Sequence, residues 1–93
     1  MKNPPHPGEL LRDMAFEPPG LGVSEIAEHL KMSRSALSRV FNGHAGISPD
    51  LAIRLEQAGI SNARFWINLQ ANYDLAEAQK RKQPKITPLQ HAS

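Results

Sequence analysis

The sequence predicts an all-α protein of five helices. Its apolar residues recur at spacings of three and four, and no stretch alternates between apolar and polar residues as a half-buried strand does. The eight prolines all fall near the ends of these periodic segments or between them, where they delimit helices without breaking them. With 93 residues and 40% hydrophobic side chains, the chain suits one domain with a single core.

The first two predicted helices are short, and each has a recognisable start. Pro7 suits a first helical position, and the apolar residues after it predict a helix to Ala15 or Phe16. Ser24 is expected to cap the second helix, because its hydroxyl can accept a hydrogen bond from a first-turn amide. That helix is expected to stop near Lys31.

Serine caps also predict the third and fourth helices. Ser33 is expected to begin a helix that reaches Asn42-Gly43, where glycine readily supplies a left-handed closing conformation. Ser48 followed by Pro49 repeats the start signal, and the fourth helix is expected to run to Gly59.

The fifth predicted helix is the longest, and Ser61 is expected to cap it. Its apolar stripe predicts a buried face, and the aromatic residues Phe65, Trp66 and Tyr73 more often indicate a core or a dimer face than a base-stacking platform. The basic Lys80-Arg81-Lys82 is interpreted as a solvated helix end, with contact to phosphate or an acidic partner as the less favoured alternative. We expect residues 1–83 to form the domain and 84–93 a flexible tail. The apolar stripe of the fifth predicted helix consists of Trp66, Leu69, Tyr73 and Ala76.

Composition and motifs argue against several classes of function. The absence of cysteine excludes disulfides, thiolate metal sites and thiol catalysis. No catalytic triad, phosphate-binding loop or set of three metal ligands stands out, so we expect neither an enzyme nor a bound cofactor or metal. No apolar run reaches the roughly 18 residues of a membrane span, and the start lacks a signal-peptide core. We therefore expect a cytoplasmic protein with no membrane partner.

The charge distribution is more informative than the net charge of +2. From His29 to Pro49 the chain has three Lys and Arg residues and no carboxylate. Two short helices joined by about three residues are also the arrangement of helix-turn-helix DNA readers, and the predicted second and third helices have it.

The predicted third helix divides into an apolar side and a polar side. At about 100° per residue, the polar residues span roughly 140°. Arginine can bind guanine through two hydrogen bonds, asparagine can pair with adenine, and serine can contact phosphates or base edges. A merely solvated face is the alternative, but the short turn and the acid-free window favour DNA. The candidate contacts are Arg34, Ser35, Ser38, Arg39 and Asn42.

These residues also carry a resemblance to a known family. Val23 to Val40 resembles the phage-repressor type of helix-turn-helix. The opening His6-Pro7-Gly8-Glu9-Leu10-Leu11, the Gly46-Ile47-Ser48-Pro49 stretch and the block from Phe65 to Leu75 are similar to HigA-type antitoxins of bacterial toxin–antitoxin pairs. The resemblance covers about His6 to Ala78. Its buried helix-turn-helix positions are matched by Ile26, Ala27, Leu30, Leu37 and Val40.

The sequence departs from this pattern at two places. Lys31 stands at the turn position where the superfamily often has glycine. The segment from Gly59 to Arg64 lacks the proline expected before the Trp66 block.

The resemblance implies a five-helix, phage-repressor-like fold in a homodimer that binds an inverted-repeat operator in its own promoter. It also implies neutralisation of a partner toxin that cleaves mRNA, and it adds Ser33 to the DNA-contacting candidates. Dimerisation follows from mechanism too, because two short helices on a two-fold axis read two half-sites. We expect the dimer contact along the fourth and fifth helices. A solitary repressor without a toxin and a protein-binding module without DNA affinity remain the alternatives.

Overall fold

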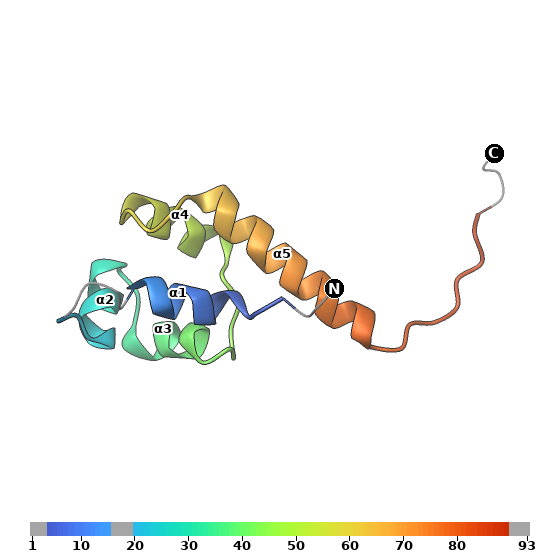
Figure 1. Cartoon of the computed structure of the whole chain (residues 1–93), viewed down its shortest axis with the longest axis horizontal. Coiled ribbons are helices and arrows are strands. Elements are labelled where there is room, and N and C mark those ends of the chain that lie inside the picture. Colours follow the sequence, from blue (N-terminus) through green and yellow to red (C-terminus); the bar gives the residue numbers. More distant parts are fainter. Residues whose placement is uncertain (1–3, 16–19, 90–93) are drawn as a thin grey trace.

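The computed structural model describes residues 4–15 and 20–89, which form five helices and no strand (Figure 1). The all-α prediction is therefore confirmed. No helix in the described ranges is long and apolar enough to cross a membrane. Phe16 lies outside those ranges, as do residues 90–93 of the predicted tail. The helices are α1 (Pro7–Ala15), α2 (Val23–His29), α3 (Arg34–Phe41), α4 (Pro49–Gln57) and α5 (Ala63–Lys80).

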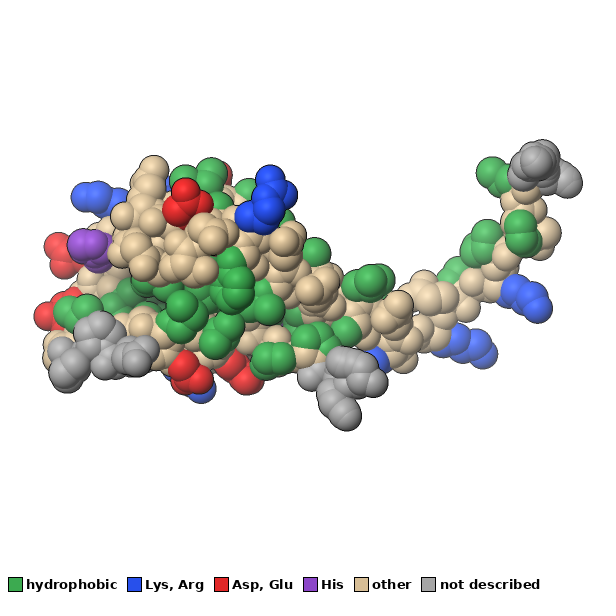
Figure 2. All heavy atoms as spheres, turned by 45° about the horizontal axis from the view of Figure 1, so that its top comes forward, with side chains coloured by type: hydrophobic (Ala, Val, Ile, Leu, Met, Phe, Trp, Pro, Cys, Tyr) green, Lys and Arg blue, Asp and Glu red, His purple; other side chains and the backbone are tan. Residues whose placement is uncertain are grey.

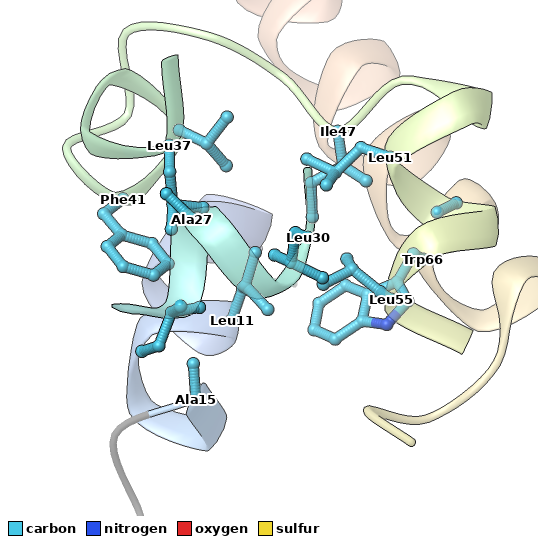
Figure 3. Close-up of a cluster of buried hydrophobic side chains, with 13 residues drawn as sticks. Leu11, Ala15, Ala27, Leu30, Leu37, Phe41, Ile47, Leu51, Leu55 and Trp66 are labelled. Carbon is cyan, nitrogen blue, oxygen red and sulfur yellow. The ribbon is translucent and has the colours of Figure 1, made fainter. Parts of the chain in front are cut away.

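A single hydrophobic core joins the five helices. Trp66 of α5 is fully buried and lies beside Leu55 of α4 and Leu30 after α2 (Figure 3). Its indole Nε1 donates a hydrogen bond of 2.7 Å to the carbonyl oxygen of Ile60, so the polar end of the ring is satisfied inside the core. All five apolar positions predicted to be buried in the helix-turn-helix are buried. The helix-turn-helix thus packs with α1 on one side of the core, and Trp66 joins that side to α4 and α5.

Helix α1 packs against α3 at Gly8, which is buried. A β-carbon at this position would overlap the backbone carbonyl of Val40 in α3. Neither helix can yield locally, because a backbone carbonyl cannot rotate away as a side chain can. We expect Gly8→Ala to lower the free energy of unfolding by about 1–3 kcal/mol, the usual cost of overpacking. Urea denaturation followed by far-UV circular dichroism measures this loss.

Gly22→Ala is the matched control for Gly8→Ala. A β-carbon at Gly22 would meet only the Glu25 carboxylate, at 3.7 Å, and that side chain can move. We expect this control to cost less than about 1 kcal/mol, the range of a weakened helix cap. Equal losses in the two variants would show that close packing of α1 on α3 does not constrain residue 8.

Two of the predicted serine caps are confirmed. The Ser33 hydroxyl accepts a hydrogen bond of 3.1 Å from the Ala36 amide, and the Ser48 hydroxyl accepts one of 3.2 Å from the Leu51 amide. Each bond satisfies an amide that the first turn of a helix leaves without an intrahelical partner. Gly43 after α3 has the positive φ that the sequence predicted for a closing glycine.

The other two predicted caps are wrong. Helix α2 begins one residue before Ser24, because Gly22 is the cap and Glu25 Oε1 accepts a 2.7 Å hydrogen bond from the Gly22 amide. Ser61 has a φ of 59°, whereas a cap residue needs an extended backbone. Asn62 caps α5 instead, and its Oδ1 accepts a 2.8 Å hydrogen bond from the Phe65 amide.

The C-terminal part of α5, drawn in orange, runs away from the body of the molecule (Figure 1). The long axis of the molecule measures 57 Å, against 24 and 22 Å for the other two. Residues 82–89 continue outward without helix or strand, and all of them are exposed. The division of the chain into a domain of residues 1–83 and a flexible tail of 84–93 stays a proposal.

Candidate nucleic-acid interface

The turn between α2 and α3 sets the angle at which the two helices meet. Lys31 has a φ of 59°, the left-handed conformation that glycine adopts most easily. Its amide donates a hydrogen bond of 3.1 Å to the Glu28 carbonyl, and the Met32 amide donates one of 3.0 Å to the Ala27 carbonyl. This pair of bonds is the Schellman closure of a helix. Lysine therefore forms the turn that glycine often forms in this superfamily.

A side chain from α4 stabilises this turn. Arg54 Nη1 donates hydrogen bonds to the carbonyl oxygens of Lys31 at 2.9 Å and of Leu30 at 3.3 Å. These carbonyls lie at the C-terminal end of α2, where the helix dipole favours a cation. Bonds to a charged donor are stronger than neutral ones, so they offset part of the cost of a left-handed lysine. Arg54 thereby fixes the geometry of the turn from outside the helix-turn-helix.

Six residues at and after the start of α3 form the surface predicted to contact DNA. We call this set the recognition face: Ser33, Arg34, Ser35, Ser38, Arg39 and Asn42. All are exposed except Ser38, which is half-buried. The opposite side of α3 buries Leu37, Val40 and Phe41 in the core. The core therefore fixes the rotation of the helix and leaves the recognition face toward solvent.

The structure arranges the serine and asparagine side chains in two groups. Ser33 and Ser35 lie at the N-terminal end of α3, with their hydroxyl oxygens 3.5 Å apart. One turn further along, Asn42 Nδ2 donates a hydrogen bond of 3.3 Å to the Ser38 hydroxyl. Because Ser33 also caps α3, one lone pair of its hydroxyl is already used by the Ala36 amide. A phosphate oxygen could still accept its proton.

The two arginines differ in how firmly they are held. Arg39 Nη2 donates a hydrogen bond of 3.0 Å to the His44 carbonyl in the loop after α3. That bond anchors one end of the guanidinium and leaves its remaining donors free for another acceptor. Within the described part of the chain, the Arg34 side chain makes no hydrogen bond or ion pair. Arg34 is therefore free to turn toward a ligand, whereas Arg39 is already oriented.

The loop from Gly43 to Ser48 supports Arg39 and is itself tied to α5. Gln70 Oε1 accepts a hydrogen bond of 2.7 Å from the Ile47 amide, and Gln70 Nε2 donates one of 2.9 Å to Asp74 Oδ1. Gly46 lies directly against the Gln70 side chain. Through these contacts α5 holds the loop that accepts the Arg39 bond.

The six residues predicted to contact DNA do lie on the solvent side of α3, but the sequence did not predict the side chains that support this face. Arg54 and Gln70 lie 23 residues from the turn and loop atoms that they bind. Contacts across such separations leave no periodic or local signal in a single sequence. The role of Arg54 could be predicted only by asking which cation can bond the carbonyl oxygens beside the left-handed Lys31.

The window from His29 to Pro49 is free of acids along the chain, but one carboxylate lies near the recognition face in space. The nearest carboxylates along the chain are Glu28 and Asp50, and both stand outside that window. Asp50 also lines an open groove between α3 and α4, together with Ser35, Arg39 and Arg54. No cluster of three or more His, Asp or Glu residues that could hold a metal ion occurs among residues 4–15 and 20–89.

Comparisons with known proteins agree with this geometry. A helix-turn-helix family model matches residues 20–59, which span α2, α3 and α4. Virulence-associated protein A of Dichelobacter nodosus is 46% identical over 90 residues, covering 96% of this chain and 88% of that protein. Antitoxin HigA-1 of Vibrio cholerae is 32% identical over 82 residues, covering 88% of this chain and 77% of that protein.

A solved structure of a relative has the same fold as this chain. The Pseudomonas aeruginosa antitoxin HigA, determined with the higBA promoter, superposes with a TM-score of 0.76 at 39% identity, covering 83% of this chain and 84% of that one. Relatives of the chain are named as transcriptional regulators and antitoxins, not as enzymes. From the helix-turn-helix geometry and these similarities together, the chain belongs to the HigA-type antitoxin family of helix-turn-helix proteins.

Proposed function

We propose that this protein binds operator DNA as a homodimer and represses its own promoter, and that it neutralises a cognate mRNA-cleaving toxin. In this proposal α3 enters the major groove, with Arg34 and Arg39 contacting base edges or phosphates. Ser33, Ser35, Ser38 and Asn42 supply further polar contacts from the same face.

The observation that carries the proposal is the recognition face itself. It presents hydrogen-bond donors from a helix whose rotation the core fixes, and it contains no carboxylate that phosphate would repel. Arg39 is held in place by the loop after α3, so binding costs less conformational entropy there. The HigA of P. aeruginosa with the same fold was solved together with promoter DNA, which favours DNA as the ligand here.

Exposed apolar side chains on α4 and α5 support the homodimer. Ile53 is 50% exposed, Phe65 37% and Leu75 59%. Phe65 lies on the same side of α5 as Leu69 and Ala76, which belong to the Trp66 stripe. Helices α4 and α5 pack against each other, so these exposed apolar side chains lie on adjoining helices. A second copy packed along α4 and α5 would cover them and place two recognition faces on one two-fold axis.

The role as an antitoxin rests on family membership. The named relatives include antitoxins, and a short basic reading frame upstream of the gene would support a toxin partner. An isolated gene would favour the solitary repressor instead.

A gel-shift titration on the DNA upstream of the gene tests the proposed function. We expect a specific shift that scrambled competitor does not remove and that weakens steeply between about 50 and 200 mM salt, because cations released from phosphates drive binding. The same titration on scrambled DNA is the control. A protein that shifts neither DNA would instead be a protein-binding module, and the recognition face would then be a solvated surface.

A further inference from the structure

Charge is divided unevenly between the body of the molecule and its C-terminal segment. All nine Asp and Glu residues precede Lys80, whereas four of the eleven Lys and Arg residues lie between Lys80 and Lys85. Residues 1–79 therefore have seven cations against nine anions, a formal charge of −2, and residues 80–93 have +4. On the face drawn in Figure 2, acidic and basic side chains both lie over the body, whereas the charged side chains of the protruding segment are basic.

This segment extends from the end of α5 away from the body of the molecule (Figure 1). Lys80 is paired with Glu77 at 2.8 Å, and Gln83 Nε2 donates a hydrogen bond of 3.0 Å to the Ala78 carbonyl at the end of α5. Within the described residues, Arg81, Lys82 and Lys85 form no ion pair. We call residues 80–89 the basic arm. Its cations are thus exposed and, apart from Lys80, unpaired.

We propose that the basic arm binds phosphates of the same DNA that the recognition face reads. This inference rests on the proposed DNA-binding function. The formal charge of −2 on residues 1–79 repels DNA, and salt screens this repulsion and the attraction by the recognition face alike beyond about 8–10 Å. The arm carries the positive charge that offsets this repulsion.

The chemistry of the arm suits a phosphate backbone better than an apolar partner. Duplex DNA carries about one charge per 1.7 Å of axis, so an extended arm meets phosphates in any register. Pro84 and Pro88 restrict the backbone, which lowers the entropic cost of ordering the arm. Ile86 and Leu89 are the only large apolar side chains among residues 81–89, too few for a stable protein interface or a membrane anchor.

The test is the gel-shift titration repeated with Arg81→Ala/Lys82→Ala/Lys85→Ala in the full chain. We expect operator affinity to fall roughly 100- to 1,000-fold per chain at about 100 mM salt, and the slope of log affinity against log salt to decrease by about 2–3 per chain. The preference for operator over scrambled DNA should stay unchanged, because phosphate contacts carry no sequence information. The charge-preserving variant Arg81→Lys/Lys82→Arg/Lys85→Arg should bind like the unmodified protein.

A second variant separates the arm's charge from its apolar residues. The variant Ile86→Ser/Leu89→Ser should leave operator affinity and the salt slope unchanged. If this variant weakens binding while the alanine triple variant does not, the arm docks on a second copy of the chain and the inference is wrong. If the unmodified protein binds its operator and the alanine triple variant has the same affinity and slope, the inference alone fails. If the unmodified protein shifts no DNA specifically, the proposed function fails first and the arm has no duplex to bind.

Discussion

Trp66→Ala is expected to lower the free energy of unfolding by about 3–5 kcal/mol, the usual cost of removing a buried aromatic side chain. Trp66 is fully buried, and its ring contributes to the core formed by α2, α4 and α5. Small domains have only about 5–15 kcal/mol of stability in total. The variant should therefore be partly unfolded at moderate temperature. Far-UV circular dichroism during urea denaturation measures the loss, since the variant has no tryptophan left for fluorescence.

Two control variants separate the contributions of Trp66. Trp66→Phe keeps a large aromatic ring but removes the 2.7 Å bond to the Ile60 carbonyl, so we expect a loss of about 1–3 kcal/mol from the unsatisfied carbonyl and the smaller ring. Phe65→Ala changes the neighbouring aromatic residue, which is partly exposed, and should cost less than Trp66→Ala. A loss below about 1 kcal/mol for Trp66→Ala, far under the usual cost of a large core truncation, would mean that α5 does not hold the core together.

The helices were predictable because their signals are local. Amphipathic spacing, the Ser33 and Ser48 caps and the position of Pro49 all act within one or two helical turns. The same locality explains the errors at Ser24 and Ser61. In each case a nearby residue, Gly22 or Asn62, can also cap the helix. Which residue becomes the cap depends on which helix start lets the apolar residues reach the core.

The orientation of α3 was predictable for a different reason. Once α3 was recognised, its apolar side determined which residues face solvent, and the recognition face followed from the remaining positions. What the sequence could not show is how that face is held. The bonds from Arg54 to Lys31, from Arg39 to His44 and from Gln70 to Ile47 depend on the packing of α4 and α5.

Arg34→Ala and Arg39→Ala are each expected to weaken operator binding by about 1–3 kcal/mol in each half-site, which is about 5- to 150-fold. In a homodimer each substitution acts in both half-sites, so the total reduction in affinity can approach the square of that factor. The measurement is the gel-shift titration on operator and on scrambled DNA. Arg12→Ala is the matched control, because it removes an exposed arginine from α1, outside the recognition face.

Lysine should replace the two arginines to different extents in operator binding. Arg39→Lys keeps the charge but cannot both bond the His44 carbonyl and bind a base through two hydrogen bonds. We therefore expect it to keep the salt dependence of binding while losing part of the preference for operator DNA. Arg34→Lys should restore more of the affinity if Arg34 contacts phosphate, because lysine serves there as a point charge. If Arg34→Ala and Arg39→Ala both bind operator as tightly as the Arg12→Ala control, α3 is not the helix that reads DNA.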